Sequence, residues 1–223
     1  MNIFETKKEI PWLHYTFNNL LPEDIINYLK NIPVEEFNNG IGTAENIKSN
    51  QLAEDDLGIY KRDGIERDKN FGDTLVHNIT DSKIINLFTN KNIITKIKNE
   101  LNIDLHNKEI KAELFEIKNL YEPELHVDNS KKIITILVYI NTDVIKEAGT
   151  WLYDKYKNLH SKLDCISNSG ITFVNAPNTW HRVPVMEKGK EFKRRSLLIT
   201  YRDIPKLNYR DLIKFKKNIF IVN

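Results

Sequence analysis

The sequence predicts a mainly β fold, a sandwich or barrel of jelly-roll type with flanking helices. Two observations carry this prediction. After about residue 108 the apolar runs are short, rich in β-branched residues and separated by turn signals. The spacing typical of amphipathic helices occurs in the N-terminal half instead. Frequent strands without intervening helices are typical of sandwiches and barrels.

Composition limits the classes of function. The 223 residues carry 33 basic and 31 acidic side chains, which gives a net charge of +2. Because the basic and acidic residues are interspersed and form no basic stripe, nucleic acid is not an expected partner. Cys165 is the one cysteine, which excludes an internal disulfide framework and any cysteine-built metal cluster and fits a reducing compartment. We find no signal-peptide core at the start and no run of roughly 20 apolar residues. We therefore expect a cytoplasmic protein without a membrane partner.

The N-terminal region, 1–107, is expected to hold a strand, helices and a polar loop. Residues 11–17 suit a short strand, and the following apolar periodicity predicts a helix that begins near Pro22. Residues 38–76 are polar and glycine-rich, which indicates either a lid that closes over the barrel mouth or a disordered segment. Residues 81–101 have apolar side chains at spacings of three and four, which predicts one or two amphipathic helices.

The region 108–205 is expected to form the β core, and 206–223 a C-terminal extension with a final helix and a short strand, so that 1–223 make one domain. The predicted strands of the core lie in these runs: AELFEIKNL (112–120), KKIITILVYIN (131–141), GTWLYD (149–154), LDCIS (163–167), GITFVN (170–175) and RRSLLITY (194–201).

Three residues form a candidate metal site. His126 and Asp128 are two apart in an extended segment, so their side chains point to one face. They directly precede the most strand-like run of the chain, and His181 follows a later strand. Two imidazoles and one carboxylate are the ligand set of non-heme Fe(II), which keeps three coordination positions open. The other histidines lack a partner at ligand spacing and are interpreted as surface or core residues.

Arg194 and Ser196 form a candidate anion site. Alternation places them on one face of their strand, and Arg195 on the other. A guanidinium that points into a barrel is costly unless it meets an anion, and its planar fork matches a carboxylate. The sequence therefore predicts a carboxylate receptor. The alternatives are that Arg194 is a solvated strand residue in a basic run, or that Arg195 is the inward one.

The ordered motifs HVDN, KIITILVYIN, AGTWLYD, GITFVNAPNTWHRVPV and RRSLLITY resemble the Fe(II)- and 2-oxoglutarate-dependent oxygenases, in particular their prolyl-4-hydroxylase-like branch. The resemblance covers roughly residues 110–203, and a looser likeness reaches the N-terminal strand and helix. It implies a double-stranded β-helix core with a cupin-like jelly roll. It also implies that His126, Asp128 and His181 are iron ligands. The cosubstrate-binding residues that it implies are Arg194, Ser196 and Tyr139.

The function implied by this resemblance is a dioxygenase that uses Fe(II), 2-oxoglutarate and O₂, with ascorbate as a candidate supporting reductant. It would hydroxylate a C–H bond of a small molecule, amino acid or peptidyl substrate and release succinate and CO₂. Thr135 and Leu137 share the face of Tyr139 and are expected to line the pocket. The main alternative is a metal-binding cupin-like domain, an isomerase or a binding module, without oxidative activity. A third is a β-sandwich interaction module with incidental histidines.

Overall fold

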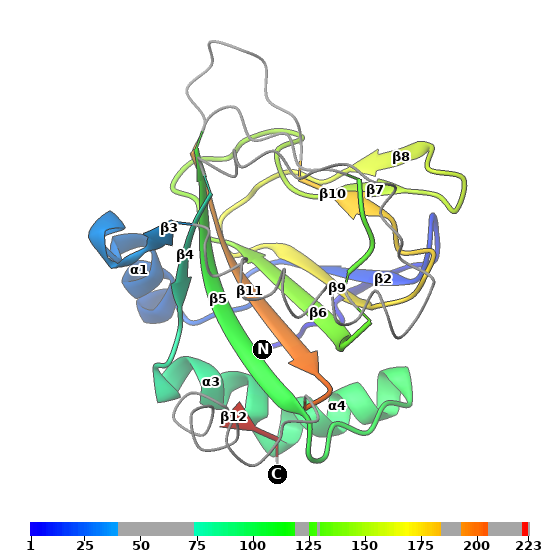
Figure 1. The fold of residues 1–223 in the computed structure, drawn as a ribbon, viewed down its shortest axis with the longest axis horizontal. Coiled ribbons are helices and arrows are strands. Elements are labelled where there is room, and N and C mark those ends of the chain that lie inside the picture. Colours follow the sequence, from blue (N-terminus) through cyan, green and yellow to red (C-terminus); the bar gives the residue numbers. More distant parts are fainter. Residues whose placement is uncertain (40–73, 119–124, 129, 184–192, 205–219, 223) are drawn as a thin grey trace.

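The computed structural model describes residues 1–39, 74–118, 125–128, 130–183, 193–204 and 220–222. Within these residues the chain forms two antiparallel sheets. The larger sheet has the order β1 (Thr6–Lys8), β2 (His14–Phe17), β9 (Gly170–Val174), β6 (Lys132–Tyr139), β11 (Lys193–Arg202), β5 (Glu109–Lys118), β4 (Thr74–Asn78) and β3 (Asn38–Asn39), and β12 (Phe220–Ile221) also pairs with β5. The smaller sheet consists of β10 (His181–Arg182), β7 (Trp151–Tyr153) and β8 (Leu159–Lys162). The predicted fold class, mainly β with a jelly-roll core, is confirmed (Figure 1).

The helices form where local capping and periodicity favour them. Helix α1 (Glu23–Asn31) begins after Pro22 and has acidic residues in its first turn, and a 3-10 turn, η1 (Val34–Glu36), follows it. The segment predicted as one or two helices forms two, α3 (Ser82–Thr89) and α4 (Lys91–Leu101). They separate at Asn90, whose backbone is extended and whose side chain accepts a hydrogen bond from the Ile93 N–H.

The helices cover the outer face of the larger sheet. Their apolar side chains pack with alternate residues of the central strands, such as Ile134 and Ile136 of β6 and Leu197 and Ile199 of β11. Because side chains alternate along a strand, the intervening residues face the smaller sheet across the barrel. Figure 1 shows β7, β8 and β10 on the side away from the helices. The barrel interior is therefore lined by the residues that are not used for helix packing.

Some segments differ from their predicted structure. The run 163–167 contributes only a single bridge, between Cys165 and Ile145, whereas the preceding strand β8 was not predicted. Strand β8 is mostly exposed and lacks an apolar alternation, which is the signal that marks a half-buried strand. The proposed lid 38–76 lies outside the described residues except for its ends, in β3 and β4. Among the described residues no helix is long and apolar enough to span a bilayer.

Candidate active site

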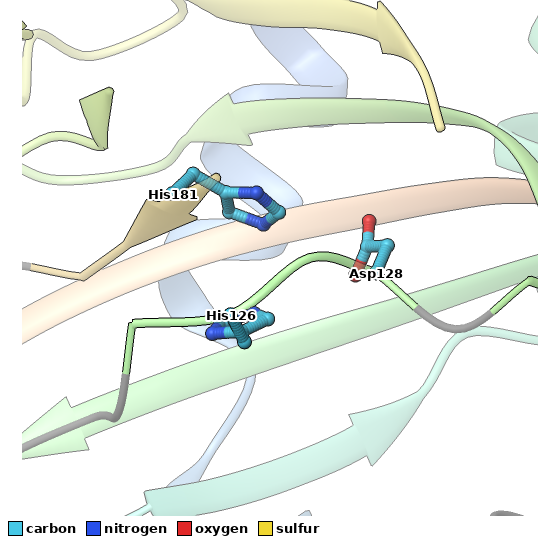
Figure 2. A group of neighbouring side chains, drawn as sticks. All are labelled: His126, Asp128 and His181. Carbon is cyan, nitrogen blue, oxygen red and sulfur yellow. The ribbon is translucent and has the colours of Figure 1, made fainter. Parts of the chain in front are cut away.

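The three predicted metal ligands lie together at one end of the barrel. His126, Asp128 and His181 each offer a ligand atom, and these atoms lie within 4.8 Å of one another (Figure 2). The two histidines form an antiparallel bridge in which the backbone N–H of each donates to the carbonyl of the other, at 3.1 and 2.9 Å. This pairing places both imidazoles on the same side, and their ring centroids are 4.6 Å apart. No other such group occurs among the described residues.

His181 is held in an orientation suited to metal coordination. Its Nδ1 lies 2.8 Å from the carbonyl oxygen of Thr179, which can only accept a hydrogen bond, so Nδ1 carries the proton and Nε2 keeps its lone pair. Phe173 packs against the ring with a centroid distance of 5.1 Å. Burial lowers the pKa of His181, although the nearby Asp128 carboxylate acts in the opposite direction. The imidazole is therefore neutral, as a metal ligand must be.

The Asp128 carboxylate is nearly buried and has a partner at each oxygen. Lys132 Nζ donates to Oδ1 and Thr135 Oγ1 donates to Oδ2, both at 2.6 Å. Burial alone would raise the pKa of Asp128, but Lys132 and the two histidines outweigh it and hold that pKa well below its usual range. The Asp128 carboxylate is thus ionised, and its two hydrogen bonds fix its orientation. The role of Lys132 was not predicted, because a lysine four residues after an aspartate is common in loops.

Arg194 lies on the inner face of β11. The register places Ser196 opposite Tyr139, Leu198 opposite Leu137 and Thr200 opposite Thr135 on β6. Arg194 continues this row, and its guanidinium carbon lies 5.2 Å from the centroid of the Tyr139 ring. The inner row of β6 therefore reaches both the candidate metal site and the candidate anion site. Thr135 donates a hydrogen bond to Asp128, and Tyr139 lies beside Arg194.

The guanidinium of Arg194 is buried, and one of its edges is unused by the described residues. The residue is 1% exposed, and its Nε and Nη2 atoms have no hydrogen-bond partner within the part of the chain that the structure describes. These two nitrogens form one edge of the guanidinium, where two parallel N–H groups match the two oxygens of a carboxylate. A buried charge with an unused fork indicates a binding position for an anion.

Arg195 points to the opposite face and has a structural role. Its Nε donates to Glu116 Oε2 at 2.9 Å, and its Nη1 donates to backbone carbonyls at the end of α1, those of Leu29, Lys30 and Ile32. Burial alone would raise the pKa of Glu116, but its hydrogen bond with Arg195 lowers that pKa below its ordinary value. Of the two adjacent arginines, the structure therefore places Arg194 inside the barrel.

The wall around Arg194 is largely apolar. Its buried side chains are Ile117, Tyr139, Ala148 and Cys165, and Leu137, Ile145 and Val183 pack against them. The Tyr139 hydroxyl donates to Thr150 Oγ1 at 3.0 Å, and burial raises the pKa of Tyr139, so this hydroxyl stays protonated. A Cβ at Gly149 would come within 2.8 Å of that hydroxyl and of two backbone oxygens. Thr150 and Cys165 were not predicted here, because no motif marks them.

Comparisons with known proteins show which fold this is. No protein-family model and no curated protein matches the sequence. Among solved structures, dioxygenase for auxin oxidation 1 from Arabidopsis thaliana, in a complex with 2-oxoglutarate, has a TM-score of 0.50 at 12% identity, over 87% of this chain and 85% of that one. A Pseudomonas putida prolyl-4-hydroxylase has a TM-score of 0.49 at 12% identity, over 86% and 92%. The likeness to the Arabidopsis dioxygenase shows that the chain shares the fold of that protein.

Proposed function

We propose that this protein is an Fe(II)- and 2-oxoglutarate-dependent dioxygenase that hydroxylates a C–H bond and releases succinate and CO₂. The observation that carries the proposal is the buried fork of Arg194, which has no partner among the described residues and lies on the inner face that also carries Thr135, the hydrogen-bond donor to Asp128. A metal-binding cupin without a dicarboxylate cosubstrate has no need of a buried cation at this position, because desolvating an unpaired guanidinium is costly.

The donor set fits the metal that this function requires. His126, Asp128 and His181 would hold Fe(II) through two neutral imidazoles and one carboxylate, which leaves open positions for a bidentate cosubstrate and O₂. The redox chemistry of O₂ activation and oxidative decarboxylation comes from the iron when it is bound. The protein contributes the fixed orientation of the ligands, through the hydrogen bonds that Thr179 and Thr135 make to them.

The residues around Arg194 fit a dicarboxylate. We assign the distal C5 carboxylate of 2-oxoglutarate to the Nε and Nη2 edge of Arg194, with the neighbouring Ser196 as a further donor. The Tyr139 hydroxyl becomes another donor when it turns from Thr150 Oγ1 to the carboxylate. The apolar wall excludes water from this ion pair, which strengthens the charge-assisted hydrogen bonds. The substrate class is proposed as a small molecule, a free amino acid or a peptidyl residue.

The proposal is tested by measuring succinate formation. Purified protein with Fe(II), 2-oxoglutarate, O₂ and ascorbate is screened against amino acids, peptides and metabolites, with Asp128→Ala as the matched control. We expect 2-oxoglutarate-dependent succinate release that a substrate stimulates and that Asp128→Ala abolishes. Metal binding without any succinate above that control, across the panel, would instead support the cupin-like isomerase or binding module.

A further inference from the structure

Asn141 lies just beyond the end of β6, beside the part of β11 that carries Arg194. It is 6% exposed, and its side-chain amide makes two hydrogen bonds to the β11 backbone. Nδ2 donates to the Lys193 carbonyl at 2.9 Å, and Oδ1 accepts from the Arg195 N–H at 3.0 Å. Since these two residues flank Arg194, one side-chain amide holds the backbone on both sides of the buried arginine.

The strand geometry explains why a side chain is needed here. The β6–β11 ladder ends at Tyr139 and Ser196, and one further backbone hydrogen bond, from the Ile140 N–H to the Arg195 carbonyl at 2.9 Å, lies beyond it. On its other edge, Arg194 remains paired with Ile117 of β5. The amide of Asn141 offers one donor and one acceptor, as a peptide group does, and so replaces the missing backbone partner. Without it, among the described residues only the Ile140–Arg195 backbone bond would hold this part of β11 on the β6 edge.

The same amide also connects to the wall of the pocket. The thiol of Cys165 donates to Asn141 Oδ1 with a sulfur–oxygen distance of 3.3 Å. Cys165 is fully buried and belongs to the cluster around Tyr139. The backbone beside Arg194 and the Cys165 side of the apolar wall therefore share one hydrogen-bond acceptor, Asn141 Oδ1.

We propose that Asn141 is a positioning residue that fixes the guanidinium of Arg194 for the distal carboxylate of 2-oxoglutarate. The inference rests on the proposed function, because it assigns that carboxylate to Arg194. A bidentate pair depends on alignment, and a displacement of about 1 Å at a positioned group can cost on the order of a hundredfold in rate. Within the described residues, the hydrogen bonds of the Asn141 side chain go to Lys193, Arg195 and Cys165.

Asn141→Ala tests this inference. We expect the affinity for 2-oxoglutarate, measured by calorimetry in metal-loaded, oxygen-free protein, to fall about tenfold, which corresponds to about 1.4 kcal/mol. Affinity for Mn(II) should be unchanged. In turnover, the KM for 2-oxoglutarate should rise with little change in kcat at saturation. Hydrogen exchange at the Arg195 amide should accelerate, because this N–H loses its acceptor.

Tyr201→Phe is the matched control for general destabilisation. Tyr201 lies at the far end of β11 on the outer face and is fully buried, and its hydroxyl donates to the Phe88 carbonyl at 2.6 Å. This variant loses a buried hydrogen bond from the same strand, so its stability should fall while its affinity for 2-oxoglutarate stays at the wild-type value. An equal loss of affinity in both variants would overturn the positioning role.

Asn141→Asp keeps the test decisive if the alanine variant does not fold. It is isosteric and retains the acceptor for the Arg195 N–H, but it cannot donate to Lys193, so a reduced affinity for 2-oxoglutarate is again expected. Wild-type affinity in the variants of Asn141, together with a large loss in Arg194→Ala, would refute the positioning role and leave the proposed function intact. Wild-type affinity in Arg194→Ala would refute the proposed function itself.

Discussion

Asp128 depends on two different kinds of partner. Lys132 supplies a charge to one oxygen, and Thr135 supplies a neutral, directional hydrogen bond to the other. Thr135 lies within β6, so its hydroxyl is placed by the sheet. Such outer partners hold a ligand in the orientation that the metal requires, and their loss typically lowers metal affinity by about ten- to a hundredfold.

Thr135→Val should therefore weaken metal binding at this site. The substitution keeps the shape of the side chain but leaves Oδ2 of a nearly buried carboxylate without its donor. We expect the affinity for Mn(II), measured by calorimetry, to fall about tenfold or more. Thr200→Val is the control, because Thr200 lies directly opposite on β11 and is equally buried. Equal metal affinity in both variants would contradict the role of Thr135.

At the scale of elements, the alternation of side chains along β11 gives one face to the candidate anion site and the other face to packing of the fold. Arg194 faces the barrel interior, whereas Arg195 joins β11 to Glu116 of β5 and to the end of α1. The outward pair is buried and hydrogen-bonded, so it stabilises the fold that presents the inward arginine. Removing one partner of a buried ion pair usually costs about 3–5 kcal/mol, because the other charge stays behind unpaired.

The Glu116–Arg195 pair predicts a pH dependence of stability. The pKa of Glu116 is lower in the folded protein than its ordinary value of 4.5, so its contribution is present above that pH and is lost as the pH falls through the folded pKa. Glu116→Gln should cost about 3 kcal/mol or more at neutral pH. The difference from wild type, measured by urea unfolding, should shrink as the pH falls below about 4.5. A difference that is independent of pH would contradict this account.

The sequence predicted those parts of the site that follow a strand's period. His126, Asp128, His181 and Arg194 each lie in or beside an alternating segment, and a period of two fixes the side of the sheet to which a side chain points. Asn141, Thr150 and Cys165 could not be predicted, because they meet only where strand ends and turns from separate segments come together. Strand β8 was missed because its polar side chains carry no alternation.

At the scale of the whole molecule, the site joins both sheets. His181 belongs to the smaller sheet, whereas Thr135, Tyr139 and Arg194 belong to the larger one. In the described part of the chain the helices pack on the outer face of the larger sheet, and the candidate site shares the space between the sheets with apolar side chains such as Leu152 and Phe173. A ligand that bridges these residues should therefore stabilise the entire fold and not one segment of it.

Metal binding should raise the melting temperature of the protein. A ligand at a hundredfold excess over its Kd stabilises the folded state by about 2.7 kcal/mol, which for a domain of this size corresponds to roughly 5–10 °C. We expect this shift with Mn(II) in the wild type and its loss in His181→Ala, as measured by calorimetry. His160→Ala, an exposed histidine outside the cluster, should keep the full shift. An undiminished shift in His181→Ala would place the metal elsewhere.

The most direct test of the central claim is the affinity for 2-oxoglutarate of metal-loaded, oxygen-free protein, with and without Arg194→Ala. Removing the guanidinium leaves the distal carboxylate in a buried pocket without a cation, a loss on the order of 3 kcal/mol. The account predicts that the affinity falls roughly a hundredfold while the affinity for Mn(II) is unchanged. Wild-type affinity for 2-oxoglutarate in Arg194→Ala would contradict it.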